Sequence, residues 1–394
     1  MMKLSARTKP IGLRGPVHPD VWRVCRPDEQ SPGLPLACLV TDSEAATGAR
    51  DIHLGRSPTG VPGPAVRLPT ELAHVTAGDI VAISPDGRRV TVLWKKAAKH
   101  NSLLLTEQCD NYCLMCSQPP KDRDDTWLFD RAKRVVDLLP ASAVSLGLTG
   151  GEPTLAADAL IDLLEYCRKR TPWLQLHLLS NGRRFADPSF TRRYAQVGYA
   201  DIMVGIPVYG PEACLHDFIV QAEGAFEETI HGILNLASLG QRIEIRIVLQ
   251  RHTVPVLHDL AIFIARNLLF VDQVALMGLE MTGLARPNFA EVWVDPADYQ
   301  RQLVEATRTL ADAHIVTKIF NHQLCVLDQR LWPFAVQSIS DWKNGYLDVC
   351  CGCSVRDACG GVFTTSGERV SRHLRSLDDP LPSPLDTSGR FPAG

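Results

Sequence analysis

Three closely spaced cysteines follow a short apolar run, and their spacing is suited to a metal centre. Cys109, Cys113 and Cys116 come after Leu103–Leu105, with three and two residues between successive thiols. Thiolates in such runs hold iron–sulfur clusters, and four irons with three local cysteines leave one iron without a protein ligand. The loop therefore predicts an iron–sulfur site with one iron open to chemistry. A zinc loop is the alternative, although zinc sites favour two Cys-x2-Cys pairs.

A glycine-rich acidic turn follows the next predicted strand. The run Ala143–Leu148 leads into Thr149-Gly-Gly-Glu-Pro-Thr154. Paired glycines let the backbone approach a ligand closely, and the carboxylate of Glu152 can pair with an ammonium group. Taken alone, the same residues are as readily a plain strand-to-helix turn. Its place one strand after the cysteine loop favours a binding role.

The cysteine loop and the glycine turn both lie in a region where predicted strands alternate with predicted helices, and these elements must position them. The predicted strands are 103–105, 143–148, 174–179, 201–206, 243–249 and 273–277, and the predicted helices include 126–139, 154–170, 256–269 and 297–313. This alternation is typical of parallel βαβ units. Six units are too few to close an eight-stranded barrel, so we expect an α/β fold with an open, partial (β/α)6 TIM-like barrel. Such barrels carry their chemistry on the loops after the strands.

Outside the barrel the sequence predicts three further regions. Residues 1–100 form a small β-rich accessory domain, with a hairpin at 79–94 and a loose loop at 41–70. Residues 101–314 form the barrel, 315–376 a Cys-rich module and 377–394 a disordered Pro/Ser/Asp-rich tail.

The composition indicates which partners, cellular compartment and cysteine chemistry to expect. The chain of 394 residues has 41 basic and 44 acidic residues, which argues against a general nucleic-acid surface. It has no apolar run of signal-peptide or membrane-spanning length, so we expect a cytoplasmic protein without a membrane partner. Twelve cysteines in such a protein indicate metal or redox chemistry rather than disulfides.

The cysteine loop resembles that of the radical S-adenosylmethionine (radical SAM) enzymes, whose hallmark is Cys-x3-Cys-x2-Cys after the first barrel strand. The resemblance implies a [4Fe-4S] cluster whose open iron chelates S-adenosylmethionine, and one-electron cleavage to a 5′-deoxyadenosyl radical that removes a substrate hydrogen. The residue before the third cysteine is usually aromatic in this family and is Met115 here. Its flexible apolar side chain can still cover the cofactor.

The resemblance also implies cofactor-binding roles on the neighbouring strand ends. The turn of Gly150, Gly151, Glu152 and Pro153 corresponds to the family's Gly-Gly-Glu-Pro turn, which binds the methionyl amine. Ser180 and Asn181 end the third strand, where related enzymes contact the ribose or carboxylate. Arg246 lies on the fifth strand, and its buried charge needs an anionic partner. The cofactor carboxylate and a structural ion pair are the two alternatives.

A second group of cysteines resembles the auxiliary-cluster modules called SPASM and twitch domains. Cys350, Cys353 and Cys359 match three thiols of the SPASM pattern, but the fourth position is Phe363. Cys325 would complete one four-cysteine iron–sulfur cluster, as in twitch modules. Zinc is again the alternative metal, because Zn²⁺ also binds four cysteines.

The combined pattern resembles one subgroup, the radical SAM maturase of the His-Xaa-Ser repeat system. The segments that carry this resemblance are 101–120 and 351–361. It implies a ribosomally made precursor peptide as substrate, a companion radical SAM maturase, and an electron donor such as flavodoxin or ferredoxin. Two alternatives are a radical SAM enzyme that acts on a small molecule in cofactor biosynthesis, and a non-enzymatic binding protein with zinc at both cysteine groups.

Overall fold

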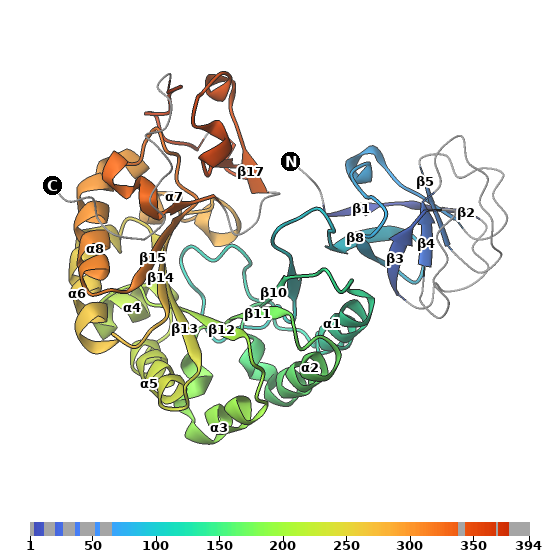
Figure 1. The fold of residues 1–394 in the computed structure, drawn as a ribbon, viewed down its shortest axis with the longest axis horizontal. Coiled ribbons are helices and arrows are strands. Elements are labelled where there is room, and N and C mark those ends of the chain that lie inside the picture. The colour runs from blue at the N-terminus through green and yellow to red at the C-terminus, as the bar shows by residue number, and fades with distance from the viewer. Residues whose placement is uncertain are drawn as a thin grey trace.

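The structure is a computed structural model. It describes residues 4–11, 20–26, 36–39, 52–55, 65–337, 343–367 and 369–377. Two large sheets organise these residues, one near the N-terminus and one in the middle of the chain, with a small hairpin after them (Figure 1). The predicted disordered tail at 377–394 lies outside the described residues except for its first residue.

The central sheet has eight strands, all parallel, in the order β16-β15-β14-β13-β12-β11-β10-β9. Neighbouring strands are consecutive in the sequence, as in a strand-helix barrel. The strands are β9 Ser102–Leu104, β10 Ser145–Thr149, β11 Gln175–Leu179, β12 Ile202–Pro207, β13 Arg242–Leu249, β14 Gln273–Gly278, β15 Val316–Phe320 and β16 Ala335–Val336.

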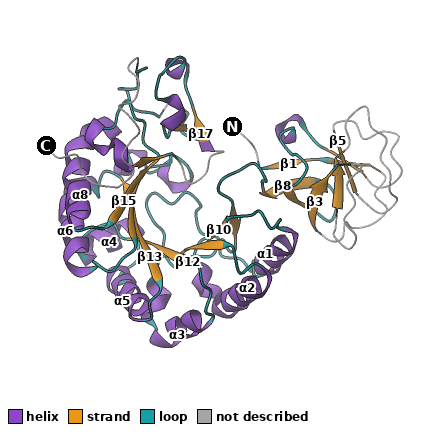
Figure 2. Cartoon of the chain, in the orientation of Figure 1, coloured by secondary structure: helices purple, strands orange, loops and turns teal. Residues whose placement is uncertain are grey.

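Helices cover the outer face of this curved sheet, and the cysteine loop lies on its inner side (Figures 1 and 2). Each helix packs through a regularly spaced apolar stripe; α8, for example, buries Leu303, Ala306 and Leu310. The α-helices are α1 Trp127–Leu138, α2 Ala157–Arg170, α3 Pro188–Gln196, α4 Ala213–Val220, α5 Ala225–Ser238, α6 Leu257–Asn267, α7 Phe289–Val292 and α8 Gln300–Asp312. Short 3-10 helices are η1 Thr70–Leu72, η2 Pro153–Ala156, η3 Arg183–Ala186, η4 Val254–Val256, η5 Gly283–Ala285, η6 Pro296–Tyr299, η7 Gln329–Phe334, η9 Asp348–Cys350 and η10 Arg356–Ala358.

The predicted partial barrel is confirmed, but its sheet is two strands longer than expected. The prediction ended the strand-helix repeat near residue 315, whereas β15 and β16 continue the sheet beyond that point. Residues 273–277 of β14 pair in register with 316–320 of β15. The predicted boundary at residue 314 therefore falls inside the barrel sheet, and Cys325 lies in the segment between β15 and β16.

The N-terminal sheet also has eight strands and confirms a separate β-rich region. Its order is β1-β8-β7-β3-β4-β5-β6-β2. The predicted hairpin is present as the antiparallel pair β7 and β8. The loose loop expected at 41–70 is wrong in part, because β5 and β6 lie within it. The strands are β1 Ser5–Arg7, β2 Lys9–Ile11, β3 Val21–Cys25, β4 Leu36–Leu39, β5 Ile52–Gly55, β6 Ala65–Arg67, β7 Ile80–Ile83 and β8 Arg89–Trp94.

The ends of this sheet are short. Strands β3 to β8 each have two neighbours, so β1 and β2 are the edges among the described residues. Each edge has three residues, and the two are separated in the chain only by Thr8. Short edges leave little room for an added strand.

The N-terminal region packs against the first helix of the barrel. Asp20 forms ion pairs with Arg134 at 2.9 Å and with Arg131 at 3.4 Å, both on α1. Val21 and Trp94 are buried and belong to the same hydrophobic cluster as the barrel core. This contact places the N-terminal sheet beside α1 (Figure 1).

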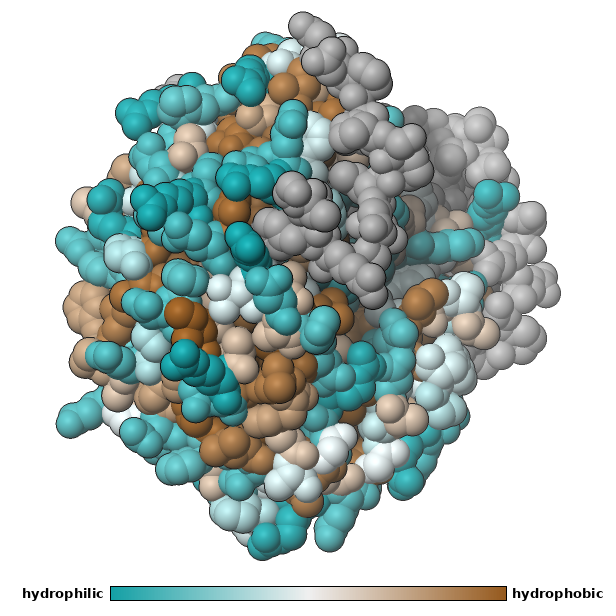
Figure 3. Space-filling view, turned by 60° about the vertical axis from the view of Figure 1, so that its left-hand side comes forward, coloured by the Kyte–Doolittle hydropathy of each residue, from teal (hydrophilic) through white to brown (hydrophobic). Residues whose placement is uncertain are grey.

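No helix in the described ranges is long and apolar enough to cross a lipid bilayer. On the face drawn in Figure 3, hydrophilic residues are interspersed with hydrophobic ones.

Two buried histidines lie close to the ends of barrel strands. The Nδ1 of His322 is 2.9 Å from the carbonyl oxygen of Phe320, and its Nε2 is 2.8 Å from Tyr299 Oη. Because a carbonyl only accepts, neutral His322 donates from Nδ1 and accepts at Nε2. His216 Nδ1 accepts from the backbone N–H of Tyr209 at 3.3 Å. Burial lowers the pKa of both His322 and His216 to about 4.

These histidines should make the fold sensitive to mild acid. Each has a folded-state pKa below its unfolded value of 6.5, so the unfolded chain binds protons first as the pH falls. The contribution of these neutral histidines to the stability of the fold is complete above about pH 6.5 and is lost as the pH falls towards 4. Between pH 7 and pH 5 we expect a loss of about 2 kcal/mol per histidine. Urea denaturation at both pH values measures it.

A His322→Gln variant is the comparison for this acid effect. It should be less stable at pH 7 but lose less stability between pH 7 and pH 5 than the natural chain. Glu244 does not contribute in this window, because hydrogen bonding by His177 and the charge of Arg246 outweigh burial and hold its pKa at about 2. An unchanged loss in the variant would contradict the assignment to His322.

Candidate functional site

The carboxyl ends of the first six barrel strands surround a cavity of about 560 Å³. Parallel strand-helix barrels place their functional residues at this end. Further along the wall, Asn321 follows β15, and Lys343 and Phe363 come from the C-terminal module. Each of the six strands contributes a wall residue: Leu104, Thr149, Leu179, Pro207, Val248 and Gly278.

All three cysteines of the predicted cluster loop line this cavity. Cys109, Cys113 and Cys116 belong to the loop that follows β9, and all three lie on the cavity wall. Burial raises the pKa of Cys109 to about 12 and raises the pKa values of Cys113 and Cys116. Nearby thiols add to the effect, since Cys109 and Cys116 both raise the pKa of Cys113. Without a metal the thiols are therefore protonated, and metal binding must release their protons.

The donor set fits an iron–sulfur cluster with one open iron. Three sulfur ligands share one wall of a cavity large enough for a small-molecule ligand beside them. In the described part of the chain, no three His, Cys, Asp or Glu side chains are drawn together tightly enough to hold one metal ion as they stand. A four-iron cluster does not require such convergence, because each thiolate binds a different iron atom.

The glycine turn after β10 packs directly against the cysteine loop. Gly151 N donates to Thr106 O at 2.8 Å, and Glu152 N donates to Gln108 O at 2.7 Å. A Cβ on Gly151 would lie 2.0 Å from Gln108 O and 3.1 Å from Cys109 Cβ. The predicted close approach is therefore present, but it brings two loops of the protein together. Gly150 and Gly151 also line the cavity, as predicted for a cofactor-binding turn.

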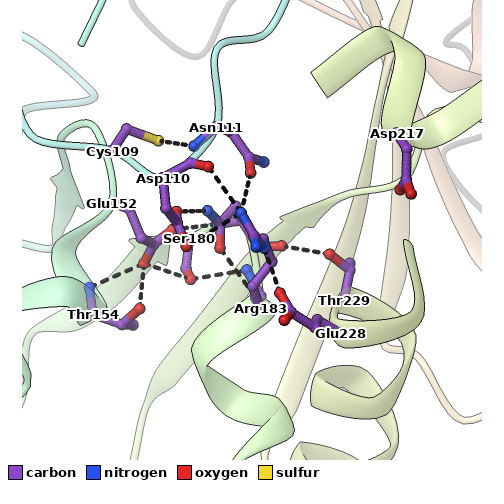
Figure 4. Close-up of polar contacts among 12 residues, drawn as sticks. Cys109, Asp110, Asn111, Glu152, Thr154, Ser180, Arg183, Asp217, Glu228 and Thr229 are labelled. Atoms are coloured by element: carbon purple, nitrogen blue, oxygen red, sulfur yellow. Dashed lines mark hydrogen bonds and ion pairs between the residues drawn. The ribbon is translucent and has the colours of Figure 1, made fainter. Parts of the chain in front are cut away.

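The side chain of Glu152 is not on the cavity wall, which corrects its predicted position. The residue is fully buried, and its carboxylate accepts from Thr154 and from the turn after β11 (Figure 4). Oε1 accepts from Thr154 N at 3.0 Å, Thr154 Oγ1 at 2.6 Å and Ser180 Oγ at 2.9 Å, and Oε2 accepts from Asn181 N at 2.5 Å. Burial raises the pKa of Glu152 despite these bonds. The carboxylate thus connects two turns, and the next residue, Pro153, is buried and is not part of the cavity wall.

Ser180, Asn181 and Met115 lie on the cavity wall, as their predicted roles require. Ser180 and Asn181 also bind Glu152, and Asn181 Nδ2 donates to Asp110 Oδ1 at 2.6 Å. Met115 is buried in a small apolar cluster that includes Leu279. These residues can shape a cofactor site, and the polar pair has a structural role as well.

Arg246 belongs both to the cavity wall and to an ion pair. Its Nη1 is 2.5 Å from Glu244 Oε1, so the buried charge of Arg246 has an anionic partner within the protein. This structural ion pair is one of the two alternatives predicted from the sequence, and Arg246 also lines the cavity. Glu244 also pairs with His177 at 3.2 Å and accepts from Gln273. A cofactor carboxylate would have to share Arg246 with Glu244.

The second group of cysteines gathers where the segment between β15 and β16 meets the C-terminal module, residues 343–377. Burial raises the pKa of Cys325, and its neighbours Cys359, Cys350 and Cys353 raise it further. Cys359 Sγ accepts from the backbone N–H groups of Leu324 and Gly361, each at 3.4 Å. Cys351 is exposed. The four predicted ligands therefore lie in one neighbourhood, and Cys351 is turned to solvent.

Part of the cavity wall was not predicted from the sequence. Lys343 Nζ forms an ion pair with Glu280 Oε2 at 2.7 Å, and Thr365 Oγ1 donates to Glu280 Oε1 at 3.1 Å. Phe363, which stands where the SPASM pattern has a cysteine, lies on the same wall. It belongs to β18 Val362–Phe363, which pairs with β17 Asn344–Gly345. The charge of Lys343 was visible in the sequence, but no local pattern connects it to Glu280 more than sixty residues away.

A family model matches the part of the chain that carries the cysteine loop and the glycine turn. Residues 103–255 match the family model described as the radical SAM superfamily. A search of curated proteins gave no match. Among solved structures, native anSMEcpe with bound AdoMet and Cp18Cys peptide is 17% identical, with 54% of this chain and 58% of that chain covered and a TM-score of 0.41. This chain thus spans less than three fifths of that protein.

Two further solved structures have similar scores. A radical SAM methyltransferase from Sphaerobacter thermophilus is 14% identical, with 63% of this chain and 74% of that chain covered and a TM-score of 0.41. Coproporphyrinogen III oxidase (HemN) from Escherichia coli is 13% identical, with 54% and 53% covered and a TM-score of 0.41. The family implies an enzyme with a [4Fe-4S] cluster and S-adenosylmethionine. Residues 103–255, with their three thiols at the mouth of a parallel barrel, are a radical SAM domain.

Proposed function

We propose that this chain modifies a ribosomally made precursor peptide of the His-Xaa-Ser repeat type. The observation that carries the proposal is that the cavity of the cluster loop is walled partly by the C-terminal module, through Lys343 and Phe363. The segments that resemble the repeat-system maturases, 101–120 and 351–361, belong to the cluster loop and to this module. A site shared by a barrel and a second module offers an extended surface for a polypeptide.

The chain's own residues have positioning roles in this scheme. Cys109, Cys113 and Cys116 hold the [4Fe-4S] cluster, and Gly150 and Gly151 form the wall beside it. When bound, the cluster and S-adenosylmethionine supply a 5′-deoxyadenosyl radical that removes a hydrogen atom from the substrate. The protein's part is to orient the groups and to exclude side reactions.

Further wall residues complete the cofactor and substrate sites. Met115, Ser180 and Asn181 line the cofactor's side of the cavity, and Arg246 is available to a carboxylate that can share it with Glu244.

The C-terminal cysteines serve a second iron–sulfur cluster in this proposal. Cys325, Cys350, Cys353 and Cys359 supply four thiols, the number that a fully ligated cluster needs. These four thiols would hold the cluster, which when bound would supply a one-electron acceptor or a binding site for the substrate. Reduction of the first cluster is assigned to an external donor such as flavodoxin or ferredoxin, and a companion radical SAM maturase acts on the same peptide.

Mass spectrometry of the candidate peptide after co-expression tests the proposal. We expect a mass change confined to the fragment that contains the repeats, and none in cells that carry a Cys113→Ala variant. An unmodified peptide, together with cleavage of S-adenosylmethionine by the enzyme when no peptide is present, would favour a small-molecule substrate. Zinc in place of iron at both cysteine groups would instead support the non-enzymatic alternative.

A further inference from the structure

Arg183 holds the segment between the first two cysteines of the cluster loop. It follows the turn after β11 and begins η3. Its Nη1 donates to the backbone oxygen of Asp110 and to Asn111 Oδ1, each at 2.8 Å (Figure 4). The same nitrogen lies 3.4 Å from Asp110 Oδ2. One guanidinium therefore contacts backbone and side chain of two consecutive loop residues.

Arg183 is itself fixed from its other side. Its Nε donates to Glu228 Oε2, on α5, at 2.6 Å. The side chain of Arg183 is only 15% exposed, so water weakens these charged contacts less than at an open surface. The planar guanidinium has five donors in a fixed geometry, which lets it serve Glu228 and the loop together.

The turn that carries Arg183 also binds the glycine turn. Asn181 Nδ2 donates to Asp110 Oδ1 at 2.6 Å, and Asn181 N donates to Glu152 Oε2 at 2.5 Å. Thr229 Oγ1, on α5, donates to Asn181 O at 3.0 Å. The turn after β11 thus connects the cysteine loop, the glycine turn and α5 (Figure 4).

We propose that Arg183 is a positioning residue for the cluster loop, which fixes the peptide between Cys109 and Cys113. The loop has no helix or strand of its own between these cysteines, so its shape depends on such contacts. Groups outside the ligand set commonly orient metal ligands and tune the metal they hold. The inference rests on the cluster assigned to this loop under the proposed function.

Hydrogen exchange of the metal-free protein tests whether Arg183 fixes the loop between Cys109 and Cys113, without any cluster. The probes are the amides of Tyr112 and Leu114, which donate to Val220 O and Ile219 O, each at 2.9 Å. An Arg183→Gln variant should exchange both amides about tenfold faster, equivalent to about 1.4 kcal/mol. Arg183→Lys should give an intermediate increase, because an ammonium group lacks the planar fork.

Arg193→Gln is the matched control. It removes an arginine from the nearby helix α3 that pairs with Asp158 on the surface at 2.6 Å. Exchange at Tyr112 and Leu114 should be unchanged in this variant. Equal exchange in the natural chain and in both Arg183 variants would overturn the proposal.

A second readout separates positioning of the cluster from general stability. After reconstitution to equal iron content, the EPR signal of the reduced cluster should broaden or shift in Arg183→Gln and not in Arg193→Gln. Identical spectra would overturn a role toward the cluster. If the natural chain binds no cluster, the proposed function fails, while the exchange comparison still decides whether Arg183 fixes the loop.

Discussion

A Cys113→Ala variant, purified without oxygen, should lose the iron of the cluster loop and all cleavage of S-adenosylmethionine. Cys113 is the middle ligand of the three and stands on the cavity wall with Cys109 and Cys116. Two remaining thiols cannot complete the three-cysteine set that leaves one iron open. Iron bound at the C-terminal module should remain. Iron analysis and assay of 5′-deoxyadenosine measure the two effects.

Cys214→Ala is the control for this experiment. Cys214 is exposed on α4 and has no assigned metal role. Its removal should leave both iron content and cleavage unchanged. A Cys113→Ala protein that retained the natural iron content and cleaved S-adenosylmethionine at the natural rate would remove the cysteine loop from the chemistry.

A methyl group at position 151 should separate the cysteine loop from the glycine turn. In Gly151→Ala the new Cβ would lie 2.0 Å from Gln108 O, which is backbone and cannot move without moving Cys109. Overpacking of this kind costs about 1–3 kcal/mol. We therefore expect S-adenosylmethionine to bind the reconstituted enzyme roughly 10- to 100-fold more weakly, measured by equilibrium binding.

Leu155→Ala provides the comparison on the same turn. Leu155 lies four residues after Gly151 and is 44% exposed. This variant should bind the cofactor as the natural chain does. If Gly151→Ala kept natural affinity and iron content, the tight contact between the two loops would have no part in forming the site.

The sequence was sufficient to predict the barrel and the edge of its sheet at which the cysteine loop and the glycine turn meet. Periodic apolar runs identified the six strands from β9 to β14, and the rule that loops follow strand ends brought Cys109 and Gly151 to one edge. The hairpin of β7 and β8 was predictable because its Ser-Pro-Asp-Gly turn separates two strongly apolar runs. Each of these features depends on a pattern within one short segment, and such a pattern can be recognised in a single sequence.

Side-chain direction within a turn was not predictable in the same way. Glu152 was expected to face a ligand, but its carboxylate finds hydrogen-bond donors in Thr154, Ser180 and Asn181 and is fully buried. An acidic residue after two glycines is compatible with either direction. Only the position of the neighbouring turn decides between them.

Contacts between distant segments were also beyond the sequence. Strands β15 and β16 were missed because short 3-10 helices and the four-residue α7 interrupt the regular alternation around them. Arg183 and Asp110 are separated by more than seventy residues, and both read as ordinary polar loop residues. Their pairing becomes visible only when the parallel strands bring consecutive loops together.

EPR spectroscopy of the reduced natural protein, with and without S-adenosylmethionine, tests the central claim most directly. The claim is that the loop of Cys109, Cys113 and Cys116 presents one iron to the cofactor. We predict a reduced [4Fe-4S] signal that changes when S-adenosylmethionine is added and that is absent from the Cys113→Ala variant. A protein that binds zinc at this loop, or a cluster signal that the cofactor leaves unchanged, would contradict the account.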